Sequence, residues 1–64
     1  MKKTKPQALL IGADGNIFNL TGIASAALKR AGQAVQAAEM TKRVLASGSY
    51  EEALFIIGEY VEII

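Results

Sequence analysis

The side chains that most often carry catalysis or bind metals are scarce in this chain of 64 residues. It has no histidine and no cysteine, which excludes imidazole acid–base catalysis, thiol nucleophiles and the usual soft metal sites. Carboxylates remain, but Glu51 and Glu52 are neighbours in sequence, whereas an acid–base pair needs carboxylates that face each other across a cleft. We therefore predict a non-catalytic protein without a cofactor.

Two overlapping motifs near residue 14 resemble ligand-binding loops. Asp14 and Asn16 match the first half of a calcium loop, but a predicted helix follows them directly, in place of further oxygen ligands and a closing glutamate. The segment from Gly12 to Gly15 has too few glycines for a phosphate-binding loop, and no Lys-Ser or Lys-Thr pair follows it. A turn at Asp14-Gly15 explains the segment, because glycine adopts positive φ at little cost. No metal site is predicted.

The seven basic side chains all lie in residues 1–43 and provide the alternative reading, nucleic-acid binding. They would merge into one phosphate-binding surface if the N-terminal tail lay near the ends of the first two helices. These residues are Lys2, Lys3, Lys5, Lys29, Arg30, Lys42 and Arg43. Two observations weigh against this reading: the pairs at 29–30 and 42–43 fall in the closing halves of predicted helices, where cations complement the helix dipole, and no aromatic residues alternate with the charges.

The hydrophobic spacing predicts a mainly α fold, in which a short N-terminal strand is followed by a three-helix bundle. Residues 1–6 are basic and poor in hydrophobic side chains, and Pro6 disfavours helix before it, so we expect a flexible tail and then one helical domain over 7–64. The hydrophobic run within 7–12 suits a strand. Its backbone N–H and C=O groups need partners, which are either residues 60–64 of the same chain or the same strand of a second chain.

The first two helices are predicted from their ends and their apolar spacing. The first runs from Ile17 to Ala31, with Asn16 as its cap and Gly32 as its stop. The second covers residues 34–47 and carries two apolar stripes. Its main face comprises Ala34, Val35, Ala38 and Leu45, and its second stripe comprises Ala37, Met40 and Val44. The second stripe contacts either a neighbouring helix or an external partner.

The third helix has the clearest start. Ser49 and Glu52 form a capping box, in which the hydroxyl accepts from the Glu52 amide and the carboxylate reaches back to the Ser49 amide. Counted from this start, one broad apolar stripe faces the core. It comprises Tyr50, Ala53, Leu54, Ile57, Tyr60, Val61 and Ile64.

Two aromatic side chains fall outside the predicted core. Phe18 lies in the first turn of the first helix, and we expect it to cover the strand. Phe55 lies on the face of the third helix opposite the apolar stripe. A single exposed aromatic needs no special explanation, and the geometry also changes if residues 61–64 leave the helix. The alternative is an interface anchored by Phe55, Ile56 and Ile63, rimmed by Glu59 and Glu62, and extended by Ala37, Met40 and Val44 of the second helix.

Composition favours the interface. Hydrophobic residues make up 52% of the chain and the mean hydropathy is +0.28, although a domain of about 60 residues buries only about 60% of its unfolded surface. Disulfides are excluded, so self-association is the remaining route to added stability. Residues 1–48 carry a net charge of +5 and residues 49–64 one of −4, which favours attraction between the two segments, either within a chain or between copies. We predict a self-associating interaction domain, by default a two-fold homodimer.

Hydrophobic segments are all short. None approaches the roughly 18 apolar residues that a membrane span needs, and no signal-peptide core follows Met1-Lys2-Lys3. We expect a cytoplasmic protein without membrane contact.

Several motifs resemble those of a group of short uncharacterised proteins from bacterial genomes and their phages. The runs are Gly-Ala-Asp-Gly-Asn-Ile-Phe, Gly-Ile-Ala-Ser, Leu-Lys-Arg-Ala-Gly, Met-Thr-Lys-Arg-Val, Ser-Gly-Ser-Tyr-Glu-Glu-Ala-Leu and Ile-Ile-Gly-Glu-Tyr-Val-Glu-Ile. The resemblance covers nearly all of residues 8–63 and implies a shared fold but no activity, because the motifs are turns, caps and core stripes. The chain departs from the group where small or apolar residues stand in place of polar ones, at Ala26, Ala34, Val35, Ala37 and Phe55. These departures suggest an engineered interface on a natural scaffold; the alternative is a natural accessory protein that binds nucleic acid.

Overall fold

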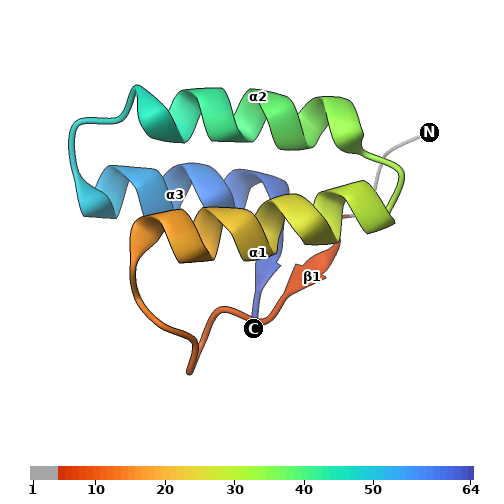
Figure 1. Cartoon of the computed structure of the whole chain (residues 1–64), viewed down its shortest axis with the longest axis horizontal. Helices are drawn as coiled ribbons and strands as arrows, with labels where there is room; N and C mark the ends of the chain where they lie inside the picture. The colour runs from red at the N-terminus through yellow and green to blue at the C-terminus, as the bar shows by residue number, and fades with distance from the viewer. Residues whose placement is uncertain (1–4) are drawn as a thin grey trace.

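The computed structural model describes residues 5–64 and confirms one N-terminal strand followed by three helices. The elements are β1 (Gln7–Ala8), α1 (Ile17–Arg30), α2 (Ala34–Leu45), α3 (Tyr50–Tyr60) and β2 (Glu62–Ile63). The helices lie side by side as a bundle, and the two short strands lie against α1 and α3 (Figure 1). The fold is therefore mainly helical, with a small sheet along one side of the bundle.

Local signals define both ends of α1. The Asn16 side chain accepts a hydrogen bond from the Phe18 amide at 2.9 Å, as predicted for the N-cap. At the other end Gly32 adopts a φ of 77°, and the Gln33 amide donates across the turn to the Leu28 carbonyl at 2.8 Å. This is a Schellman motif, in which glycine is favoured because its φ is positive. It ends the helix one residue earlier than predicted.

Side chains from before and after the start of α3 accept hydrogen bonds from backbone amides there. The Ser49 hydroxyl accepts from the Glu52 amide at 3.1 Å, which confirms the predicted cap. The Glu52 carboxylate reaches one residue further back than predicted, to the Gly48 amide at 2.8 Å. The Tyr50 hydroxyl donates to the Gly15 carbonyl at 2.7 Å. This last bond ties the start of α3 to the loop that precedes α1.

The two strands pair in parallel, with Ala8 opposite Ile63. The Ile64 carbonyl extends the pairing by accepting from the amides of Leu10 and Ile11 at 2.8 and 2.9 Å. The C-terminal segment of the same chain is thus the partner of β1, which decides between the two partners that the sequence left open. The strand itself is shorter than predicted.

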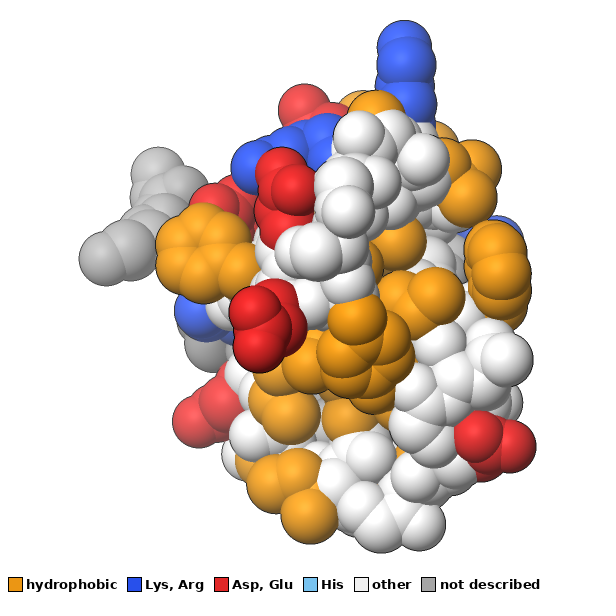
Figure 2. All heavy atoms as spheres, turned by 90° about the vertical axis from the view of Figure 1, so that its left-hand side faces the viewer, with side chains coloured by type: hydrophobic (Ala, Val, Ile, Leu, Met, Phe, Trp, Pro, Cys, Tyr) orange, Lys and Arg blue, Asp and Glu red, His pale blue; other side chains and the backbone are white. Residues whose placement is uncertain are grey.

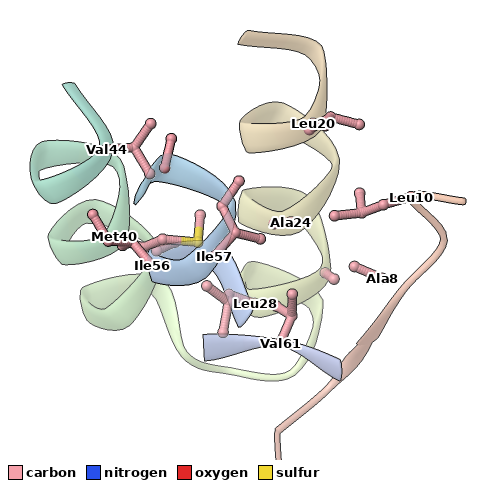
Figure 3. Packing of buried hydrophobic residues seen from close by; sticks show 13 residues of the cluster. Ala8, Leu10, Leu20, Ala24, Leu28, Met40, Val44, Ile56, Ile57 and Val61 are labelled. Carbon is pink, nitrogen blue, oxygen red and sulfur yellow. The ribbon is translucent and has the colours of Figure 1, made fainter. Parts of the chain in front are cut away.

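The core lies where the three helices meet and extends to the sheet. It comprises Ala8, Leu10, Leu20, Ala24, Ala27, Leu28, Ala37, Met40, Val44, Ala53, Ile56, Ile57 and Val61. In Figure 3, Met40 of α2 points toward Ile56 and Ile57 of α3, and Ala8 and Leu10 lie beside α1. Contacts from all three helices and from β1 therefore form one continuous core.

The two stripes of α2 are placed in the reverse of the predicted order. The predicted second stripe of Ala37, Met40 and Val44 is buried, and the predicted main face of Ala34, Val35, Ala38 and Leu45 is exposed. The exposed face also carries a valine and a leucine, so the amount of apolar surface does not decide between the two stripes. The prediction that the second stripe belongs to an external interface is therefore wrong, since its side chains pack inside the monomer.

The helix α3 ends before the last four residues. Val61 is extended, with φ −134° and ψ 156°, and its side chain is fully buried. Glu62 and Ile63 consequently leave the helix and enter β2. Their predicted positions on the outer face of α3 are wrong, because pairing with β1 replaces the last helical turn.

Candidate interaction surface

The outer face of α3 carries Phe55. Its side chain is 71% exposed, whereas Ala53 and Ile57 of the opposite face are buried. Two of its predicted companions lie elsewhere: Ile56 is only 6% exposed because it faces α2 within the core, and Ile63 lies on β2. The predicted apolar patch is therefore reduced to one aromatic side chain.

Acidic side chains surround Phe55 along the helix. Glu51, Glu52 and Glu59 lie three or four positions from it on α3, which places them one turn away on the helix surface. Glu62, the other predicted rim residue, lies on β2 instead. We call Phe55 together with Glu51, Glu52 and Glu59 the acidic knob.

A polar cluster joins α3 to α2 and includes Glu59 of the acidic knob. Arg43 donates to the Glu59 carboxylate at 2.7 Å and to the Tyr60 hydroxyl at 3.1 Å, and its guanidinium lies 5.6 Å from the centroid of the Tyr60 ring. The Tyr60 hydroxyl in turn donates to Glu39 at 3.0 Å. The hydrogen bonds with Tyr60 and Glu59 raise the pKa of the Arg43 guanidinium above its ordinary value. The cluster is solvent-exposed, so it orients the two helices and contributes little stability.

A groove runs between α1 and α2. It has a volume of about 410 Å³ and is lined by Ser25, Lys29, Ala34, Ala37, Ala38, Thr41, Lys42 and Leu45. Most of these side chains are small, and Lys29 and Lys42 give the groove positive charge. It lies on the flank of α2 away from α3, because the opposite flank carries Arg43 and Glu39, which bond to α3. We call it the basic groove.

The other basic residues proposed for nucleic-acid binding do not join Lys29 and Lys42 there. Lys5 donates to the Gly58 carbonyl at 2.9 Å, beside the end of α3. Arg30 is exposed at the end of α1. Lys2 and Lys3 lie outside the described residues. Within residues 5–64 the predicted basic residues are therefore divided among separate places on the surface.

Two further hollows, which the sequence did not reveal, meet at Tyr50. One of about 340 Å³ is lined by Ile17, Phe18, Val44, Leu45, Ser47, Gly48, Ser49, Tyr50 and Ala53. The other, of about 260 Å³, is lined by Leu10, Ile11, Gly15, Leu20, Tyr50, Leu54 and Ile63. Figure 2 views the end of the molecule where α2 turns into α3, and hydrophobic side chains gather there in several groups. These residues come from distant parts of the chain, so no local pattern could group them.

Phe18 does not take the place expected of it. Its side chain is 70% exposed, and it lines the hollow beside the α2–α3 turn rather than the strand. The prediction that it covers β1 is wrong, because Leu10 and Ala8 of that segment are already buried against the helices. Phe18 is thus another exposed aromatic side chain, on α1 rather than on α3.

The polar groups near residue 14 serve the turn. The Asp14 carboxylate accepts from the Asn16 amide at 3.0 Å, and the Asn16 side chain caps α1. Between residues 5 and 64 no cluster of three or more acidic side chains has an arrangement that could hold a metal ion. In the same part of the chain no helix combines the length and hydrophobicity needed to cross a bilayer. Comparisons with protein-family models, curated proteins and solved structures found no match to this chain.

Proposed function

We propose that this protein is a non-catalytic interaction domain that associates with further copies of itself. The observation that carries the proposal is that the monomer leaves large hydrophobic side chains exposed while alanines occupy part of its core. Five of the 13 core residues are alanines, whereas six large hydrophobic side chains are each at least 66% exposed. These six are Leu9, Ile11, Phe18, Val35, Leu45 and Phe55. Apolar surface that the monomer does not bury is available to a partner.

Two charged surfaces support a second copy as that partner. The acidic knob on α3 presents an aromatic side chain between glutamates, and the basic groove presents small side chains between Lys29 and Lys42. Opposite charges steer association and exclude partners of the wrong sign. Self-association through α3 and the exposed alanine-rich flank of α2, at Ala34 and Ala38, uses both surfaces.

Sedimentation equilibrium of the pure protein at several concentrations tests the proposal. We expect a mass that rises above the 6.8 kDa of one chain as the concentration increases. A mass of 6.8 kDa throughout the accessible range would refute self-association. Filter binding of DNA and RNA at about 50 and about 200 mM salt tests the competing reading, since phosphate contacts weaken steeply with salt; retention by a monomeric protein would favour nucleic-acid binding instead.

A further inference from the structure

The acidic knob and the basic groove lie on different faces of one molecule. Phe55 projects from α3 on the side opposite its core residues Ala53 and Ile57. The basic groove lies beyond α2, on the flank that does not contact α3. A chain therefore cannot place its own Phe55 in its own groove.

We propose that Phe55 of one copy inserts into the basic groove of the next copy, so that the molecules associate head to tail. This inference rests on the proposed self-association. The groove is an open hollow of about 410 Å³ on the surface. The alanines at 34, 37 and 38 leave room for an aromatic ring, and a buried aromatic side chain is the usual anchor of an interface.

Charge favours the groove over a second α3 as the site that receives Phe55. In a two-fold dimer through the outer faces of α3, the glutamates of the two knobs would lie opposite one another, and like charges across an interface disfavour it. In the groove Glu51 and Glu52 would meet Lys29 and Lys42, while Glu59 remains paired with Arg43 of its own chain. The head-to-tail arrangement is thus the one in which the charges of both surfaces are complementary.

The arrangement determines how the assembly grows. Each copy offers one knob and one groove, and filling either leaves the other free. Such a contact closes into a ring, the smallest of which is a dimer whose two copies exchange knobs, or continues as an open chain. The mass of the parent assembly distinguishes the reciprocal dimer, at about twice 6.8 kDa, from a larger ring or an open chain.

Three single variants separate the parts of this proposal. Phe55→Gln removes the anchor without adding charge, and Ala38→Glu places a bulky acidic side chain in the groove. Val35→Gln is the matched control, because Val35 is 79% exposed on the same helix but does not line the groove. All three positions are exposed, so each variant should give the circular dichroism spectrum of the parent.

Sedimentation equilibrium of the variants, alone and mixed, provides the test. We expect Phe55→Gln and Ala38→Glu each to weaken association about tenfold or more, since each prevents burial of the phenyl ring, and Val35→Gln to leave it unchanged. An equimolar mixture of Phe55→Gln and Ala38→Glu should form a complex of about twice 6.8 kDa that does not grow further. In that complex the first chain supplies an intact groove and the second an intact knob.

Other results would overturn the head-to-tail arrangement. It fails if either knob or groove variant assembles as tightly as the parent, if Val35→Gln weakens association equally, or if the mixture stays monomeric. A monomeric parent refutes the proposed self-association as well. A parent that assembles, together with an undiminished Phe55→Gln variant, refutes only the insertion of Phe55.

Discussion

Phe55 and Ile56 are adjacent in sequence, and substitutions at the two positions should have opposite consequences. Ile56 is 6% exposed within the core and Phe55 is 71% exposed. Ile56→Val deletes one buried methylene, which should lower the free energy of unfolding by about 0.5–1.5 kcal/mol. Phe55→Gln changes an exposed position, so its effect on the free energy of unfolding should stay within about 0.5 kcal/mol.

The difference is measurable against the total stability expected of a chain this small. At about 0.05–0.15 kcal/mol per residue, the free energy of unfolding is about 3–10 kcal/mol. With a urea m-value of about 1 kcal/mol/M, Ile56→Val should lower the unfolding midpoint by about 0.5–1.5 M. Circular dichroism should follow the transition at the lowest workable protein concentration, because association of folded copies adds stability.

The two substitutions should have the reverse order of effect on the affinity of self-association. Phe55→Gln should weaken it about tenfold or more, while Ile56→Val should leave it unchanged at concentrations where the monomer is folded. If Phe55→Gln lowered the urea midpoint of the dilute protein as far as Ile56→Val does, Phe55 would be packed inside the monomer. The assignment of the two faces of α3 would then be refuted.

Three further substitutions and one deletion test the local structure by thermal or urea unfolding. Ser49→Ala removes the hydroxyl that caps α3 and should cost about 1 kcal/mol; an unchanged midpoint would show that the cap is not needed. Gly32→Ala should lower the free energy of unfolding by about 1–2 kcal/mol, because φ is 77° at this position. Gly22→Ala should raise it by about 0.5–1 kcal/mol, because Gly22 lies within α1 and no atom is near an added Cβ. Equal effects of the two substitutions would contradict the assigned backbone conformations. Deletion of residues 62–64 removes at least four backbone hydrogen bonds to residues 6–11 and should cost at least about 2 kcal/mol, so retention of parental stability would mean that the sheet contributes nothing.

The helix ends were predictable because their signals are local. Asn16, Gly32 and Ser49 satisfy backbone groups within a few residues of themselves, so residue type and spacing suffice to recognise them. Even here the structure differs in one detail: the Glu52 carboxylate bonds to the Gly48 amide. The order of the helices is predictable for the same reason, because these local signals mark where helices begin and end without reference to tertiary contacts.

The buried face of α2 was not predictable from periodicity alone. Its residues form two apolar stripes, and alanine contributes so little apolar surface that the stripes have similar weight. The narrow stripe through Met40 and Val44 fits between α1 and α3, whereas Val35 would have to displace it to be buried. The outcome depends on the shape of the space between two other helices, and that space is a property of the folded chain.

The conformation of the C-terminal segment was also not predictable from its own residues. Its composition suits either a helix or a strand, and the choice depends on β1, which lies 55 positions earlier in the chain at the pair of Gln7 and Glu62. A helical wheel drawn through Ile63 therefore placed this residue on the wrong surface. The position of Ile56 was misjudged for a related reason: the core direction of α3 is rotated toward α2, because Met40 occupies the space between them.

Alanines that contribute to the core also line the basic groove. Ala24 and Ala27 of α1 and Ala37 of α2 are buried, and small side chains at a helix contact allow the axes to approach closely. Ala37 also lines the groove, and Ala34 and Ala38 continue the same row of small residues to the surface. A larger side chain at Ala37 would therefore disturb the fold and the groove together, whereas one at the exposed Ala38 affects the groove alone. An aromatic side chain from another copy would fill the space that these alanines leave open. The residues that contribute little buried apolar surface to the monomer therefore also form the groove in which association would bury more.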